Sequence, residues 1–266
     1  MCSSDLIKDT KFTSCFDQCG SIVLYNDSPA FEYACKAPID NNLNETLVIL
    51  VQNAEVYSGI TYMYEDGAAI ACIPKSRDAY PFDFRGVMQH EAGGHGFGKL
   101  GDEYIYHNAF INSCGCSCCS HLKEFYSAKS LGWFRNMEAT GDMNEVGWSH
   151  LIFNPQFSDR VDVFEGGYFH TRGIFRSEAV SCMNNNIAYF SAISRQAIVE
   201  RIMQYAGEEF TFESFAENDD ASVGITKSQA KKLGFYNPQF QIPLSLTPSP
   251  RHNHPVIIKG KPDINK

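Results

Sequence analysis

Apolar residues gather into a few runs separated by turn-rich stretches, and two of these runs have the length of strands. Residues 46–53 (TLVILVQN) form a largely apolar run bounded by polar residues, which is typical of a buried strand. Residues 68–74 (AAIACIP) form a second run, which ends at a proline. Between them, residues 54–59 (AEVYSG) and 64–67 (YEDG) favour connecting loop or sheet edge.

Two segments have the apolar spacing of a helix. The first begins after Asp83, a suitable N-cap, and continues through Met88 towards a glycine-rich stretch. The second covers Ser194–Gly207, with Ser194 as its cap and Gly207 as its stop. We expect this second helix to pack on the core through three residues: Ile198, Ile202 and Tyr205.

The remaining segments are weakly patterned. Residues 1–45 are polar and turn-rich, so we expect them to be irregular. Residues 105–160 predict long loops with short helices, and residues 243–262 hold five of the eleven prolines, which favours an extended or mobile tail. The chain thus predicts an irregular segment over 1–45, a folded domain over 46–215 and a C-terminal extension over 216–266.

Composition narrows the class of protein. The 266 residues are 44% hydrophobic and 20% charged, which is enough to bury an ordinary globular core. A net charge of −9 argues against a nucleic-acid surface, which needs a concentrated basic face. No run approaches the roughly 18 apolar residues of a membrane helix, and the N-terminus lacks the layout of a signal peptide.

The segment HEAGGHGFGKLGDEY, His90–Tyr104, resembles a helical zinc motif with an extra residue between its histidines. In H-E-x-x-H, the two zinc-binding histidines are four positions apart, and the glutamate is the general base. Here His90 and His95 are five apart, and at about 100° per residue a regular helix would turn them roughly 140° away from each other. We predict that Gly93 and Gly94 widen the helix into a π-type turn that returns both rings to one face.

A hydrolytic zinc site also needs a third ligand. Gly98 can turn the chain after the helix and bring Asp102 back, so we favour Asp102 as that ligand. Glu103 and His107 lie in the same stretch and are competing donors. The simpler alternative is a core histidine at a helix end followed by a glycine-rich loop.

Three segments in order resemble the IgA-peptidase family of bacterial zinc metallo-endopeptidases: HEAGGHGFGKLGDEY, FEGGYFHTRGIFRSEAVSCMNN and SRQAIVERIM. The resemblance covers roughly residues 45–215. It implies an α+β, metzincin-like catalytic domain with a twisted mixed sheet, an active-site helix and a methionine-bearing turn. By position, it implies zinc held by His90, His95 and Asp102, with Glu91 as general base and Met183 in the turn.

We therefore expect a zinc-dependent endopeptidase that acts on protein or peptide substrates. By the same resemblance, we expect the full-length protein to be secreted, periplasmic or at the cell surface. An inactive binding or surface protein on a peptidase scaffold is the alternative. A cysteine-rich metal-storage protein is a third reading.

Four of the ten cysteines lie in SCGCSCCSH, residues 113–121. Cys116 and Cys119 have C-x-x-C spacing with His121 nearby, which is compatible with a second zinc site. A strong zinc signature needs a second well-spaced pair, so loop disulfides or free thiols are the favoured interpretation.

Overall fold

The computed structural model describes residues 12, 14–16, 21–24, 26–38, 43–111, 118–220, 224–237 and 255–262. The chain is of the α+β class with twisted mixed sheets, as predicted. It divides into two compact units, one formed by Met1–Phe97 with Ser245–Lys266 and the other by Gly98–Leu244. The predicted limits at residues 45 and 215 rest on sequence pattern and resemblance and stay a prediction.

The first unit contains a four-stranded mixed sheet in the order β10-β4-β5-β3. The central strand β5 pairs in parallel with β3 and antiparallel with β4, and β10 pairs in parallel with β4. Both predicted strands are present, but the predicted burial of β3 is wrong, because it is an edge strand on which Ile49 and Val51 are 42% and 55% exposed. Strand β4 lies in a stretch for which we predicted no strand. The strands are β3 (Leu47–Gln52), β4 (Ile60–Tyr64), β5 (Ala69–Pro74) and β10 (Val256–Ile258).

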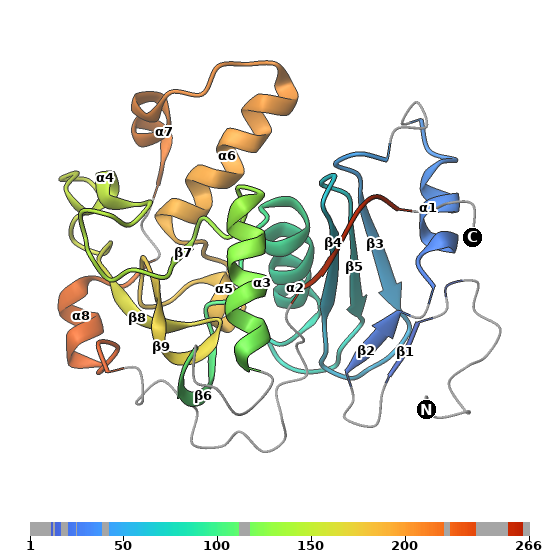
Figure 1. The fold of residues 1–266 in the computed structure, drawn as a ribbon, viewed down its shortest axis with the longest axis horizontal. Helices are drawn as coiled ribbons and strands as arrows, with labels where there is room; N and C mark the ends of the chain where they lie inside the picture. The colour runs from blue at the N-terminus through green and yellow to red at the C-terminus, as the bar shows by residue number, and fades with distance from the viewer. Residues whose placement is uncertain are drawn as a thin grey trace. The chain divides into compact units, whose positions relative to one another are not determined.

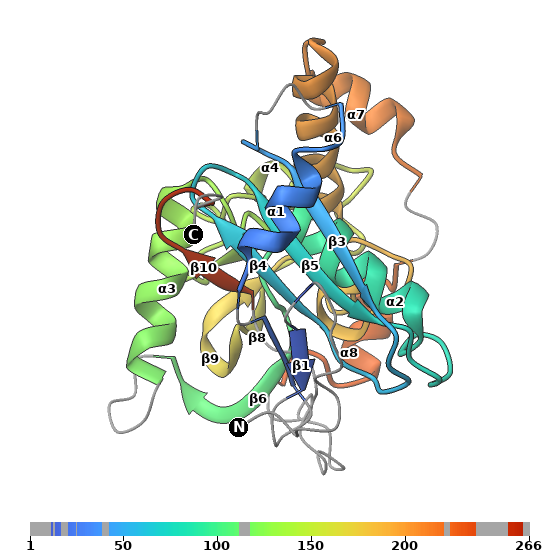
Figure 2. The same ribbon diagram turned by 90° about the vertical axis from the view of Figure 1, so that its right-hand side faces the viewer.

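Helices cover both faces of this sheet (Figures 1 and 2). Ile70 and Cys72 of β5 belong to the same core cluster as Phe31 of α1. Ala71 and Ile73 point to the opposite face, where they pack against the helical segment that carries the histidine motif. The three helical elements are α1 (Ser28–Ala34), α2 (Phe84–Met88) and the π-helix η1 (Gln89–Phe97).

The predictions for both ends of the chain are partly wrong. Residues 1–45 contain α1 and an antiparallel pair, β1 (Ser14–Phe16) and β2 (Ile22–Leu24). The C-terminal tail contains β10, whose partner β4 lies almost 200 residues earlier. Such short strands depend on hydrogen bonds to distant partners, which a local apolar pattern does not reveal.

In the second unit, strand β9 is central. Strand β6 pairs with it in parallel, and β7 and β8 pair with it antiparallel. The prediction of loops and short helices over 105–160 missed β6 and the 13-residue helix α3. The strands are β6 (Ile105–Phe110), β7 (Met137–Glu138), β8 (Phe164–Gly167) and β9 (Phe169–Arg176). The helices are α3 (Cys118–Ser130), α4 (Ser149–Ile152), α5 (Cys182–Asn185), α6 (Ala192–Ala206), α7 (Phe212–Asn218) and α8 (Lys227–Lys232).

Helix α6 confirms the predicted C-terminal helix, and Gly207 ends it in a left-handed conformation. Two details of the prediction are wrong: Ser191, not Ser194, is the N-cap, and Ile202 and Tyr205 are 49% and 51% exposed. Only the first turns of α6 are covered, by a core that includes Trp148. Periodicity identifies the apolar side of a helix, but it does not show how far along the helix the core extends.

No helix in the described part of the chain is long and apolar enough to cross a membrane.

Candidate metal centre

The helix that carries the histidine motif changes type where the motif begins. The carboxylate of Asp83 caps the helix by accepting from the Gly86 amide at 3.1 Å, as predicted. The backbone is α-helical to Met88 and then forms a π-helix from Gln89 to Phe97. The predicted widening is confirmed, although it extends over nine residues instead of a single turn.

This widening resolves the spacing conflict. In a π-helix the backbone bonds join residues five apart, so a five-residue spacing returns close to the same side. The ring centres of His90 and His95 are 4.8 Å apart, with the planes at 77°. Both rings are buried.

Strand β4 holds the carboxylate of Glu91. Thr61 Oγ1 lies 2.7 Å from Glu91 Oε2 and 3.0 Å from the Glu91 carbonyl oxygen. A Cβ on Gly59 would lie 2.5 Å from Glu91 Oε1, so a larger residue here would force the Glu91 side chain to shift. Sequence reasoning missed both residues, because the pairing of β4 with the motif helix is a tertiary contact.

The chain leaves the helix through a turn at Gly98, as predicted. The left-handed residue is the next one, Lys99, with φ of 53°. Its carbonyl oxygen accepts from the Phe134 amide at 2.8 Å. Asn136 then holds Gly101 from both sides: Oδ1 accepts from the Gly101 amide at 2.9 Å, and Nδ2 donates to the Gly101 carbonyl at 2.8 Å.

Glu103 is held by internal hydrogen bonds. Its carboxylate accepts from Asn136 Nδ2 at 2.9 Å and from Ser181 Oγ at 2.5 Å. Its amide donates to the Met183 carbonyl at 2.9 Å. Burial raises the pKa of the Glu103 carboxyl to about 7. Glu103 therefore has a structural role, and the second competing ligand, His107, is exposed on β6.

Met183 lies in the short helix α5, which begins with a capping box formed by Ser181 and Asn184. The methionine is fully buried and packs with Leu100 and Ala197. The turn therefore contacts the segment that carries Asp102 through Leu100 and through the bond from the Glu103 amide.

His90, His95 and Asp102 are all buried, and each offers one ligand atom within 4.8 Å of the others. Ligand atoms around a tetrahedral zinc ion lie roughly 3.3 Å apart, since each is 2.0–2.1 Å from the metal. Two imidazoles and one carboxylate are also a known set of catalytic zinc donors. The donor set therefore fits zinc after a small adjustment of the side chains.

The proposed cysteine site falls outside this description. Cys116 is not among the described residues, so the C-x-x-C hypothesis stays a prediction. Cys35, Cys72 and Cys182 are not disulfide-bonded.

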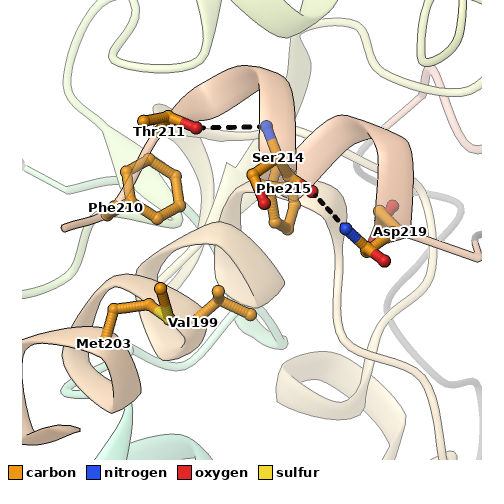
Figure 3. Close-up of a pocket in the computed structure, with 8 residues that line it drawn as sticks. Val199, Met203, Phe210, Thr211, Ser214, Phe215 and Asp219 are labelled. Atoms are coloured by element: carbon orange, nitrogen blue, oxygen red, sulfur yellow. Dashed lines mark hydrogen bonds between the residues drawn. The ribbon is translucent and has the colours of Figure 1, made fainter. Parts of the chain in front are cut away.

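A pocket of about 240 Å³ lies between α6 and α7 and contains none of the predicted site residues (Figure 3). Its lining is mainly apolar. The hydroxyl of Thr211 accepts from the Ser214 amide at its rim, and Asp219 forms an ion pair with Arg195. The lining residues are Val199, Met203, Phe210, Thr211, Ser214, Phe215, Asn218 and Asp219.

Comparison with known proteins adds no relative: no family model matches the chain, and no curated protein matches it. The proposed function therefore rests on the site residues themselves.

Proposed function

We propose that the protein is a zinc-dependent endopeptidase with a metzincin-like catalytic domain of the IgA-peptidase type. The observation that carries this proposal is the π-helix Gln89–Phe97. Glycine-rich π-helices are rare and recur at functional sites. This one turns two buried histidines towards each other and places a buried glutamate between them in the sequence.

In this proposal, His90, His95 and Asp102 hold the metal. A bound zinc ion would supply a Lewis acid that polarises the peptide carbonyl and lowers the pKa of water. We assign proton transfer to the Glu91 carboxylate, whose Oε2 lies 2.7 Å from Thr61 Oγ1. This carboxylate takes the proton from the attacking water and delivers it to the leaving amine.

The substrate class is a protein or peptide, and the proposed location is outside the cytoplasm. Cys15 is disulfide-bonded, which supports an oxidising compartment. The specificity for particular peptide sequences depends on the shape of the loops around the site.

Glu91→Gln tests the mechanism. The amide keeps the size of the side chain but cannot take a proton, so peptide hydrolysis should fall by about 10² to 10⁴. Zinc content, measured by mass spectrometry of the metal, should stay at the wild-type value. Glu217→Gln, a change of an exposed glutamate, is the matched control and should cleave at the wild-type rate.

The alternative is an inactive binding or surface protein on the same scaffold. It predicts that wild-type protein cleaves no member of a peptide library and that His95→Gln removes no zinc. Cleavage that is lost in parallel with zinc in His95→Gln supports the peptidase. Full activity in Glu91→Gln would exclude the proposed mechanism.

A further inference from the structure

A second group of histidines lies in the second unit. His107 is on β6, His121 on α3 and His170 on β9. His121 Nδ1 lies 3.0 Å from His170 Nε2, and the two ring centres are 5.3 Å apart. The ring centre of His107 lies 5.5 Å from that of His170.

The fold brings these three side chains together from distant parts of the sequence. The parallel register of β6 and β9 places His107 beside His170. Helix α3 adds His121, whose ring centre lies 5.5 Å from the ring centre of Phe169. The three elements therefore meet at one group of imidazoles.

Hydrogen bonding alone gives a weak account of this arrangement. His170 is fully buried, and its Nδ1 has no hydrogen-bond partner among the described residues. Two imidazole nitrogens 3.0 Å apart need either a proton or a metal ion between them.

The spacing matches imidazoles that share one ion. Two nitrogens bound to a tetrahedral zinc lie roughly 3.3 Å apart, and the ring centres then lie about 5 Å apart. The pair formed by His121 and His170 is close to both values. His107 lies farther out, since the ligand atoms of the three histidines are not all within 4.8 Å of one another, and its exposed side chain would have to turn towards the pair.

We propose that His107, His121 and His170 form a second binding site for zinc or a similar divalent cation. Imidazole ligands suit zinc, copper and nickel, and exclude magnesium and calcium, which prefer oxygen. A cation here would join β6, β9 and α3, so the site is structural. It is independent of the proposed peptidase activity.

The experiment uses the full chain with the first site removed, as His90→Gln combined with His95→Gln. This protein is dialysed against zinc, and its metal content and thermal stability are measured. We expect about one zinc per chain to remain and zinc to raise the melting temperature, because it binds the folded state. Adding His121→Gln, or separately the exposed His107→Gln, should abolish the bound zinc and the rise.

His150→Gln in the same background is the matched control. His150 is exposed and bonds to Gln196 Oε1 at 2.8 Å, away from the three histidines, so this variant should retain the zinc. Circular dichroism checks that each variant is folded. Cobalt in place of zinc identifies the donors, since sulfur ligands add a charge-transfer band that imidazoles lack.

Two results would overturn the proposal. The first is a protein without His90 and His95 that binds no zinc. The second is zinc that persists in both His121→Gln and His107→Gln, or cobalt that shows a sulfur band, since either places the metal on cysteines or elsewhere.

Discussion

At the residue scale, the position of Glu91 depends on Thr61 of β4 and on Gly59, which directly precedes that strand. Thr61 holds one carboxylate oxygen, and Gly59 leaves space for the other. In Gly59→Ala the new Cβ would lie 2.5 Å from Oε1, so the carboxylate must move. We predict that kcat/KM falls by about 10²-fold or more while zinc content is unchanged, because a general base must stay within hydrogen-bond reach.

A stability cycle separates this clash from a general defect. Overpacking a buried site costs about 1–3 kcal/mol, so Gly59→Ala should lower the free energy of unfolding. In a Glu91→Asp background the shorter side chain makes room for the new methyl group. Gly59→Ala should therefore lower the free energy of unfolding by less in this background than in the wild type. Equal costs in the two backgrounds would show that Gly59→Ala acts elsewhere.

Asp102 and Glu103 are adjacent and both buried, yet we predict different effects of changing them. Asp102→Ala removes a proposed metal donor, so zinc affinity at the first site should fall sharply. Glu103→Gln disturbs the bonds to Asn136 and Ser181, so it should destabilise the fold by about 1–3 kcal/mol while zinc remains bound. Zinc titration and urea unfolding measure the two effects, and the reverse pattern would make Glu103 the ligand.

The sequence predicted the three residues whose ligand atoms lie together, His90, His95 and Asp102, but not the residues that position the motif. His90, Glu91 and His95 are local in sequence, and their spacing together with the glycines predicted the π-type widening that the structure has. Thr61 and Asn136 were missed because their contacts are about 30 or more residues distant. A side chain that acts through a tertiary hydrogen bond leaves no periodic signal.

At the element scale, the π-helix has a testable dependence on its glycines. Alanine favours a regular α-helix by up to about 1 kcal/mol over glycine. In Gly93→Ala, a regular α-helix becomes more stable relative to the π-helix, and a regular α-helix would turn His95 away from His90. We predict weaker zinc binding with little loss of stability in the metal-free protein, measured by competition with a chelator and by thermal unfolding.

Gly96→Ala is the matched comparison within the same helix. A Cβ at Gly96 would lie 2.6 Å from Leu47 Cδ1, so this variant should lose stability with or without zinc. If both variants lower the stability of the metal-free protein equally, then packing rather than helix type explains the glycines.

The elements that sequence patterns predicted are those with a strong local signal. Strands β3 and β5 are apolar runs, and α6 has a helical period and a terminal glycine. Strands β4 and β10 gave no such signal, because β4 contains Thr61 among its tyrosines and β10 has only three residues. Their formation depends on the completed sheet.

At the scale of the whole molecule, metal binding should contribute to the stability of the fold. The ligands come from a helix and from the segment after it, and a chain that is unfolded does not hold them together. A ligand that binds only the folded state stabilises it by about 4 kcal/mol when its concentration is 1,000 times Kd. The sequence motif predicts this dependence, but the size of the effect depends on packing that the motif does not specify.

Removal of zinc by a chelator should therefore lower the melting temperature and abolish hydrolysis together, and added zinc should restore both. Glu91→Gln provides the control for the catalytic part: because Glu91 is not a ligand in the proposal, this inactive variant should show the same fall in melting temperature as the wild type. His121→Gln separates the two proposed sites. This variant should hydrolyse peptides and lose that activity when the chelator is added, but its melting temperature should fall by less than that of the wild type. A melting temperature that does not respond to the chelator in the wild type would contradict zinc binding at either site.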